Sequence, residues 1–193
     1  MIRSLGDKTP RIAASAFISE AAYIIGDVEI GEDSGVFPGA VIRGDFAPIK
    51  IGRKTMVEDN TVVHTGEPME IGDRNTIGHN VVIHGRRIGN YCLIGNHATI
   101  LDEAVVGDFC IIAAGSLVSP GANIPDYSMV VGIPGVIKPL TPALKKRLEH
   151  NGQMYGRLLE QYRKQPELSS RRLPGENRLQ ALPRQKPVSR NIK

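Results

Sequence analysis

The chain has 193 residues, 41% of them hydrophobic, which is enough for one domain with a buried core. Its formal charge of +4 comes from residues 166–193, which hold seven Lys/Arg and two acids, so the rest of the chain is nearly neutral. No segment is apolar enough to span a membrane, the start lacks a targeting pattern, and the basic stretch has no aromatic residue for base stacking. We therefore expect a cytoplasmic protein without nucleic-acid or membrane partners.

After a short lead at residues 1–10, an aliphatic residue recurs at about every sixth position over residues 11–139. A period of six fits neither an α-helix nor an open alternating strand, but it fits a coil with three flat sides that turns at each corner. Three hexads form one coil, so residues one coil apart stack at roughly 4.8 Å. The inward positions are Ile12, Ile18, Ile24, Ile30, Val36, Ile42, Ile51, Val57, Val63, Ile71, Ile77, Ile83, Ile88, Ile94, Ile100, Val106, Ile112, Val118, Ile124, Val130 and Val136.

Two further positions of the hexad follow a rule. The residue after the aliphatic one is often glycine, which we interpret as a bend through backbone conformations that are costly for other residues. The residue four positions after it is small or β-branched and is expected to point inward. Cys92 and Cys110, eighteen residues apart, both fall there, so we predict buried free thiols rather than a disulfide.

A helix is predicted at residues 140–165, with Thr141 as its cap and Pro142 at its first position. Its apolar face consists of Leu144, Leu148, Tyr155, Leu159 and Tyr162. We expect this face to pack along the coil or on a neighbouring subunit. Residues 166–193, rich in Pro, Arg, Ser and Gln, are predicted to form a flexible basic tail.

Three histidines lie close together in the sequence, at His64, His79 and His84. His64 and His84 each follow an inward aliphatic residue one coil apart, so they are expected to stack roughly 5 Å from each other. His79 belongs to the intervening hexad and projects from a different side of the coil. A metal shared by all three therefore requires two chains, which packing around a threefold axis would supply. Three imidazoles with an open fourth position are typical of a catalytic zinc site.

Three segments carry a family resemblance: V-I-R-G-D at 41–45, V-E-D-N-T-V-V-H at 57–64 and I-G-H-N-V-V-I-H-G at 77–85. Over residues 11–165 the chain resembles the γ-class carbonic anhydrases, a family within the left-handed β-helix superfamily. The resemblance implies an all-β fold: a left-handed parallel β-helix of hexapeptide repeats with a C-terminal α-helix. It also implies a homotrimer that binds Zn²⁺, or alternatively Fe²⁺ or Co²⁺, at its subunit interfaces through His64, His79 and His84.

The resemblance assigns roles to five more residues. It places Arg43 and Asp45 near the metal, where an Arg–carboxylate pair would hold adjacent chains in register. Glu58 stands where the family commonly has Gln, and is expected either to accept a proton from the metal-bound water or to raise the pKa of that water and even compete as a ligand. Asp59 is expected to support a ligand from behind, and Tyr155 to lie near the pocket.

The expected activity is that of a carbonate dehydratase, a lyase that reversibly hydrates CO2 to bicarbonate by metal-bound hydroxide. One alternative is a non-catalytic, metal-binding trimeric scaffold of the same family, because Glu58 replaces Gln and the acidic proton-shuttle loop of the archetypal enzyme is absent. A hexapeptide acyltransferase or thioesterase is the other alternative. Such an enzyme needs one base and an open cleft rather than three converging histidines.

Overall fold

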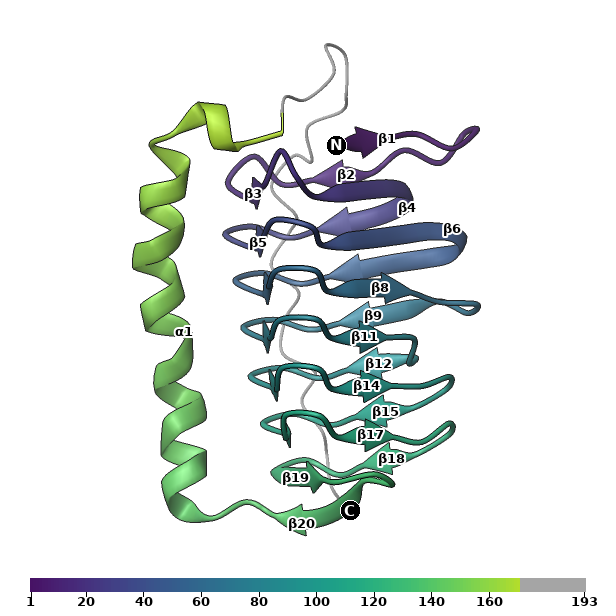
Figure 1. Ribbon diagram of the computed structural model, residues 1–193, viewed down its shortest axis with the longest axis vertical. Helices are drawn as coiled ribbons and strands as arrows, with labels where there is room; N and C mark the ends of the chain where they lie inside the picture. The colour runs from purple at the N-terminus through teal and green to yellow at the C-terminus, as the bar shows by residue number, and fades with distance from the viewer. Residues whose placement is uncertain (171–193) are drawn as a thin grey trace, which may run out of the picture.

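A computed structural model of the protein describes residues 1–170. The fold is a parallel β-helix of hexapeptide repeats closed on one side by a C-terminal helix (Figure 1). Short strands from successive coils pair in register and form the three sides of the coil. The predicted fold class is thus confirmed at the level of a β-helix with a C-terminal helix.

The first side is a sheet of seven parallel strands followed by one antiparallel strand. Its members are β3 (Phe17–Ile18), β5 (Gly35–Val36), β7 (Met56–Val57), β10 (Thr76–Ile77), β13 (Leu93–Ile94), β16 (Ile111–Ile112), β19 (Ser128–Val131) and the antiparallel β20 (Val136–Pro139). This side lies under the C-terminal helix (Figure 1).

The second and third sides are joined through two long strands, β4 (Tyr23–Ile30) and β6 (Val41–Ile51), which pass around the corner between them. The second side continues with β8 (Val62–His64), β11 (Val82–Ile83), β14 (Thr99–Ile100) and β17 (Leu117–Val118). The third contains β2 (Arg11–Ile12), β9 (Met69–Ile71), β12 (Arg87–Ile88), β15 (Val105–Val106) and β18 (Asn123–Ile124). The lead residues 1–10 contribute β1 (Ile2–Arg3), which pairs with β4.

The inward aliphatic positions form one continuous core. From Ile12 to Val130 every predicted inward residue is at most 5% exposed, and all of them belong to a single hydrophobic cluster. The small position is buried as well, and its hydroxyl groups are satisfied: Thr55 Oγ1 donates to the Gly72 carbonyl at 2.8 Å. Cys92 and Cys110 are buried and free, as predicted.

The prediction for Val136 is wrong. Its side chain is 56% exposed, because residues 132–135 turn the chain back and β20 pairs antiparallel with β19. Gly132, at φ +95°, provides the left-handed conformation at the start of this reversal. Within residues 1–170 no further coil lies beyond β20 to enclose its side chains, so the inward series ends at Val130.

The interpretation of the glycines is also wrong. Left-handed backbone occurs three positions after the aliphatic residue, as at Asn60 (φ 58°) and Asn80 (φ 55°), and not at the glycine that directly follows it. These glycines are needed for close approach instead. A Cβ on Gly52 would lie 2.7 Å from the carbonyl group of Gly72 on the next coil. The stacking of coils, rather than the bend, excludes a side chain at this position.

The helix α1 (Pro142–Arg163) runs back along the first side of the coil, from β20 towards β3, and a 3₁₀ turn at Pro166–Leu168 follows it (Figure 1). The Thr141 hydroxyl accepts a hydrogen bond from the Leu144 amide at 3.4 Å, as expected of a cap. Leu148 and Leu159 are buried against the coil of the same chain. Most of the predicted tail, residues 171–193, lies outside the described residues.

Candidate metal centre

The second side of the coil brings two histidines together. His64 ends β8 and His84 follows β11, and Val63 pairs in register with Ile83. The ring centroids are 5.0 Å apart, and His64 Nδ1 lies 3.1 Å from His84 Nε2. The repeat count thus places the two rings correctly, because residues one coil apart must stack.

Each ring of this pair has a carboxylate behind it. His64 Nε2 lies 2.9 Å from Asp45 Oδ1, and His84 Nδ1 lies 2.9 Å from Asp102 Oδ1. Because a carboxylate only accepts, these two nitrogens carry the protons in the neutral rings. The two nitrogens that face each other, His64 Nδ1 and His84 Nε2, are then both lone-pair acceptors.

Asp45 is itself held by several donors. Partial burial alone would raise its pKa, but hydrogen bonds from His64, the Phe46 amide and Arg43 outweigh this and lower the pKa of the Asp45 carboxyl. The Arg43 guanidinium pairs with Asp45 Oδ2 within the same chain. Arg43 therefore reaches the histidines through Asp45, and the Arg–carboxylate pair that the resemblance places between chains is formed here inside one chain.

His79 stands at a different corner. Its Nδ1 lies 2.9 Å from Asp59 Oδ2 and 3.9 Å from Glu58 Oε2, and its side chain is 46% exposed. Among the side chains that the structure describes, Glu58, Asp59 and His79 form a group of metal-binding residues within 4.8 Å of one another. A single chain thus leaves His79 separate from the stacked pair.

Glu58 is the most buried acid near these histidines. The residue is 6% exposed, and Oε1 has no hydrogen-bond partner among the described residues. Burial raises the pKa of Glu58, the positive field of His79 opposes this, and Asp59 adds to it. The Tyr155 hydroxyl hydrogen-bonds to Glu58, and burial together with this carboxylate raises the pKa of Tyr155 to about 12. The helix thus brings Tyr155 to Glu58.

Two residues of this region were missed from the sequence. Asp102 lies about one coil after His84, so a count along the repeat could have found it. Phe46 is 73% exposed and its ring packs edge-on at 5.7 Å from His64, yet it falls in an insertion where the repeat gives no position.

Other exposed side chains lie around the stacked histidines. Val62 and Val82, which precede the histidine positions on the same side, are exposed. Glu67 and Glu70 are exposed acids beyond His64.

Comparison with known proteins decides the family. The family described as "Bacterial transferase hexapeptide (six repeats)" matches residues 68–102 and 87–120. A Methanocaldococcus jannaschii protein named "Probable carbonic anhydrase" is 44% identical over 152 residues, covering 77% of this chain and 96% of that protein. "Gamma carbonic anhydrase 2, mitochondrial" of Arabidopsis thaliana is 38% identical over 136 residues, covering 66% of this chain. The chain belongs to the γ-class carbonic anhydrase family.

Other observations concern the length of the matched relatives, a solved structure with the same fold, and membrane-spanning segments. This chain spans about half the length of the first two Arabidopsis relatives, 49% and 50%. A solved hexapeptide transferase family protein from Anaplasma phagocytophilum superposes with a TM-score of 0.81 at 33% identity, covering 84% of this chain and 98% of that one. Within the described residues, no helix of this γ-class family member is long and apolar enough to cross a membrane.

Proposed function

We propose that this protein is a metal-dependent carbonic anhydrase that reversibly hydrates CO2 to bicarbonate. The observation that carries the proposal is the pair of lone-pair nitrogens, His64 Nδ1 and His84 Nε2, 3.1 Å apart with a carboxylate behind each ring. Two acceptors at this distance repel each other unless a metal ion or a shared proton lies between them. Two tetrahedral zinc ligands at 2.0–2.1 Å from the ion are roughly 3.3 Å apart, so the pair fits a metal.

The third ligand in this proposal is His79 of a neighbouring copy, in a homotrimer. Its Nδ1 faces Asp59, which leaves Nε2 free to bind, and carboxylate–histidine pairs of this kind are typical behind metal ligands. The exposed side chains of Phe46, Val62 and Val82 beside the stacked pair favour a subunit contact there. A threefold arrangement repeats one such contact three times.

The metal, when bound, would lower the pKa of water so that CO2 is hydrated near neutral pH. The chain's own residues would hold and move the proton. Glu58 Oε1, which is buried and has no hydrogen-bond partner among the described residues, would accept it, and Tyr155 would orient that carboxyl group. Arg43 and Asp45 fix the ring of His64, Asp102 that of His84, and Asp59 that of His79. Three imidazoles suit Zn²⁺, with Fe²⁺ or Co²⁺ as alternatives.

The first test is stopped-flow CO2 hydration by zinc-loaded protein, repeated with iron under anaerobic conditions. His79→Ala should lose bound metal and at least about 10³-fold in kcat/KM, because one of three ligands is gone. His97→Ala is the matched control, since His97 is exposed and near His79 but outside the proposed ligand set. Equal metal content in the two variants would contradict the ligand assignment.

A second experiment separates a shared site from one built within a chain. His79→Ala and His84→Ala chains are each inactive in the proposal, but a mixed trimer can bring an intact His79 to an intact His64–His84 pair. Co-expression of the two variants should therefore restore part of the metal binding and of the activity. No recovery in mixed trimers isolated by two affinity tags would exclude the cross-chain site.

The second candidate is a metal-binding trimeric scaffold without turnover. It is favoured by the burial of the Glu58 carboxyl group, which limits proton exchange with solvent, and by the exposed, dispersed acids Glu67 and Glu70. Full metal occupancy in the trimer with no hydration rate above the His79→Ala blank would establish this alternative.

A further inference from the structure

The third corner of the coil, which leads from the third side to the first, carries a column of large side chains beside α1. They are, in order, Asp33, Lys54, Arg74, Tyr91, Phe109 and Tyr127. Each has left-handed backbone, with φ between 54° and 59°. This conformation suits glycine and asparagine, which occupy it elsewhere in the coil at Gly39, Asn60 and Asn80, although His97 and Glu103 also adopt it. Large side chains at a strained backbone position indicate that the contacts they make are useful to the protein.

The aromatic end of the column has a structural use. Tyr91 stacks on Phe109 at 4.7 Å and Phe109 on Tyr127 at 5.0 Å, with the rings 5° from parallel in each case. Phe109 packs in the cluster formed by Leu148 of α1, Ile111 and Leu140. This half of the column therefore holds the first turns of the helix.

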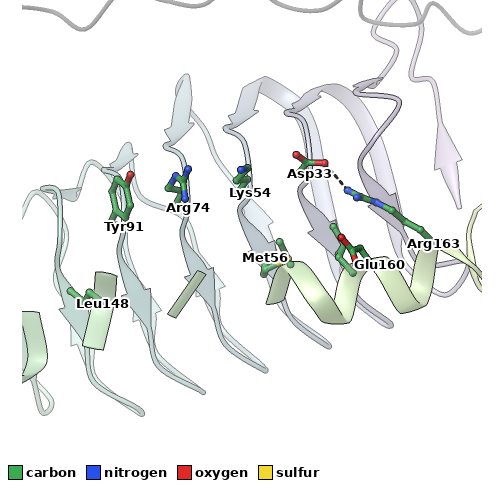
Figure 2. Close-up of a pocket in the computed structure, with 10 residues that line it drawn as sticks. Asp33, Lys54, Met56, Arg74, Tyr91, Leu148, Glu160 and Arg163 are labelled. Atoms are coloured by element: carbon green, nitrogen blue, oxygen red, sulfur yellow. Dashed lines mark hydrogen bonds and ion pairs between the residues drawn. The ribbon is translucent and has the colours of Figure 1, made fainter. Parts of the chain in front are cut away.

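The charged end is different, because the helix leaves a groove there that extends as far as Tyr91 and Leu148. A groove of about 360 Å³ runs between α1 and the column, with Lys54 and Arg74 in a row on the coil side (Figure 2). Met56 and Leu159, both almost fully buried, lie in its lining. Gly156 lines the helix side, and a Cβ there would meet no heavy atom within 4 Å. The helix thus leaves open space where most residues would fill it.

The cations of this groove are not equally neutralised. Arg163 is paired with Asp33 at 3.0 Å (Figure 2). Lys54 and Arg74, on adjacent coils, have no carboxylate within ion-pair distance in the described part of the chain, and Arg74 instead lies over the Tyr91 ring at 5.6 Å. Two like charges stacked on neighbouring coils repel each other, and an anion between them would reverse the sign of that interaction.

We propose that this groove is a second ligand site, for an organic dianion that places its charge between Lys54 and Arg74 and an apolar or ring portion on the Met56 and Leu159 floor. The volume is that of a small-molecule site and far exceeds what bicarbonate fills. Phosphate monoesters and dicarboxylates share this chemistry. The exposed acid Glu160 also lines the groove and has no ion pair among the described residues, so it opposes an anion there. Among the residues that the structure describes, no hydrogen bond, ion pair or ring contact joins the groove lining to His64, His79 or His84, so the proposal does not rest on the metal site.

The test is titration calorimetry of the full-length protein with phenyl phosphate, isophthalate and the monoanion benzoate. At least one dianion should saturate with a dissociation constant below about 1 mM, and benzoate should bind more weakly. Binding of phenyl phosphate alone would assign a phosphate ester, and binding of isophthalate alone a dicarboxylate. Absence of saturable binding by either dianion at millimolar concentrations would overturn the proposal.

Variants locate the binding. Lys54→Ala and Arg74→Ala should each weaken it about tenfold, since each removes one charge-assisted contact. Glu160→Gln should strengthen it several-fold by removing the opposing charge. The matched control is Arg53→Ala, because Arg53 is next to Lys54 but is paired with Asp73 at 3.0 Å and does not line the groove. Equal losses in Arg53→Ala and Arg74→Ala would show a general charge effect and reject the site.

Discussion

The coil has one irregular corner and two regular ones, and they carry function in different ways. At the corner between the second and third sides, the spacing of inward residues changes to nine from Ile42 to Ile51, eight from Val63 to Ile71 and five from Ile83 to Ile88. Arg43, Asp45, Phe46, His64 and His84 all follow these positions. Two of these changes are insertions and the third removes one residue. A corner can change length in this way without disturbing the stacked strands, so this corner can carry side chains for which the regular repeat has no position.

The regular corners keep the spacing of six and change only residue identity. Glu58, Asp59 and His79 stand on ordinary turns between the first and second sides, and Lys54 and Arg74 on those between the third and first. At such corners the backbone is set by stacking on the next coil. New chemistry can therefore enter there only as a side chain at an outward position.

The largest effect expected from this difference is on stability. Gly52→Ala, at a regular corner, should destabilise the protein by about 2–3 kcal/mol, because the new Cβ would lie 2.7 Å from the Gly72 carbonyl group. Gly66→Ala, at the irregular corner, meets no atom within 4 Å and should stay within about 0.5 kcal/mol of the parent. Urea midpoints measured side by side decide this, and equal losses would show that the irregular corner is packed as tightly as the others.

The next largest effect is expected on metal affinity, through the orientation of the His84 ring. Asp102→Asn should weaken metal affinity about 10- to 100-fold, because the amide is a poorer acceptor for the His84 Nδ1–H and no longer supports the ring. Glu103→Gln, one residue further along and exposed, should leave the affinity unchanged. Competition with a chelator of known affinity measures both. An Asp102→Asn protein with parent-like affinity would show that Asp102 does not position a ligand.

The smallest expected effect is a pH-dependent change in stability, which distinguishes the buried Glu58 from the exposed acids. Burial raises its pKa above the ordinary 4.5, so the folded state binds the Glu58 proton more tightly than the unfolded state does. Stability therefore falls as the pH rises above that ordinary value, and the loss is complete once the folded-state group has ionised. Metal-free Glu58→Gln should be more stable than the parent at pH 7 by about 1 kcal/mol, with the gap closing towards pH 4.5.

Urea unfolding in chelator at several pH values tests this prediction, with Glu70→Gln as the exposed control. A gap between Glu58→Gln and the parent that does not change with pH would mean that the ionisation of Glu58 has no part in it. A gap of the same size in Glu70→Gln would point to overall charge rather than burial.

Much of the site could be read from the repeat. Counting hexads predicts that His64 and His84 stack and that His79 faces elsewhere, because each coil fixes which residues lie above one another. The same count could have found Asp102 behind His84. It could not place Asp45 or Phe46, which lie in an insertion where the period is lost. Nor could it show that Tyr155 reaches Glu58, since that contact depends on how α1 packs along the first side of the coil.

The sequence by itself determined the β-helix, its core from Ile12 to Val130 and the start of the helix at Thr141, because these follow from local periodicity and capping. It misjudged the end of the coil at Val136 and the reason for the glycines. Only the tertiary structure decided those points, together with the ring partners of the histidines and the groove beside α1. The physical reason is that each depends on a neighbour from another coil or from the helix: a pattern gives the direction of a side chain, whereas packing determines what that side chain meets.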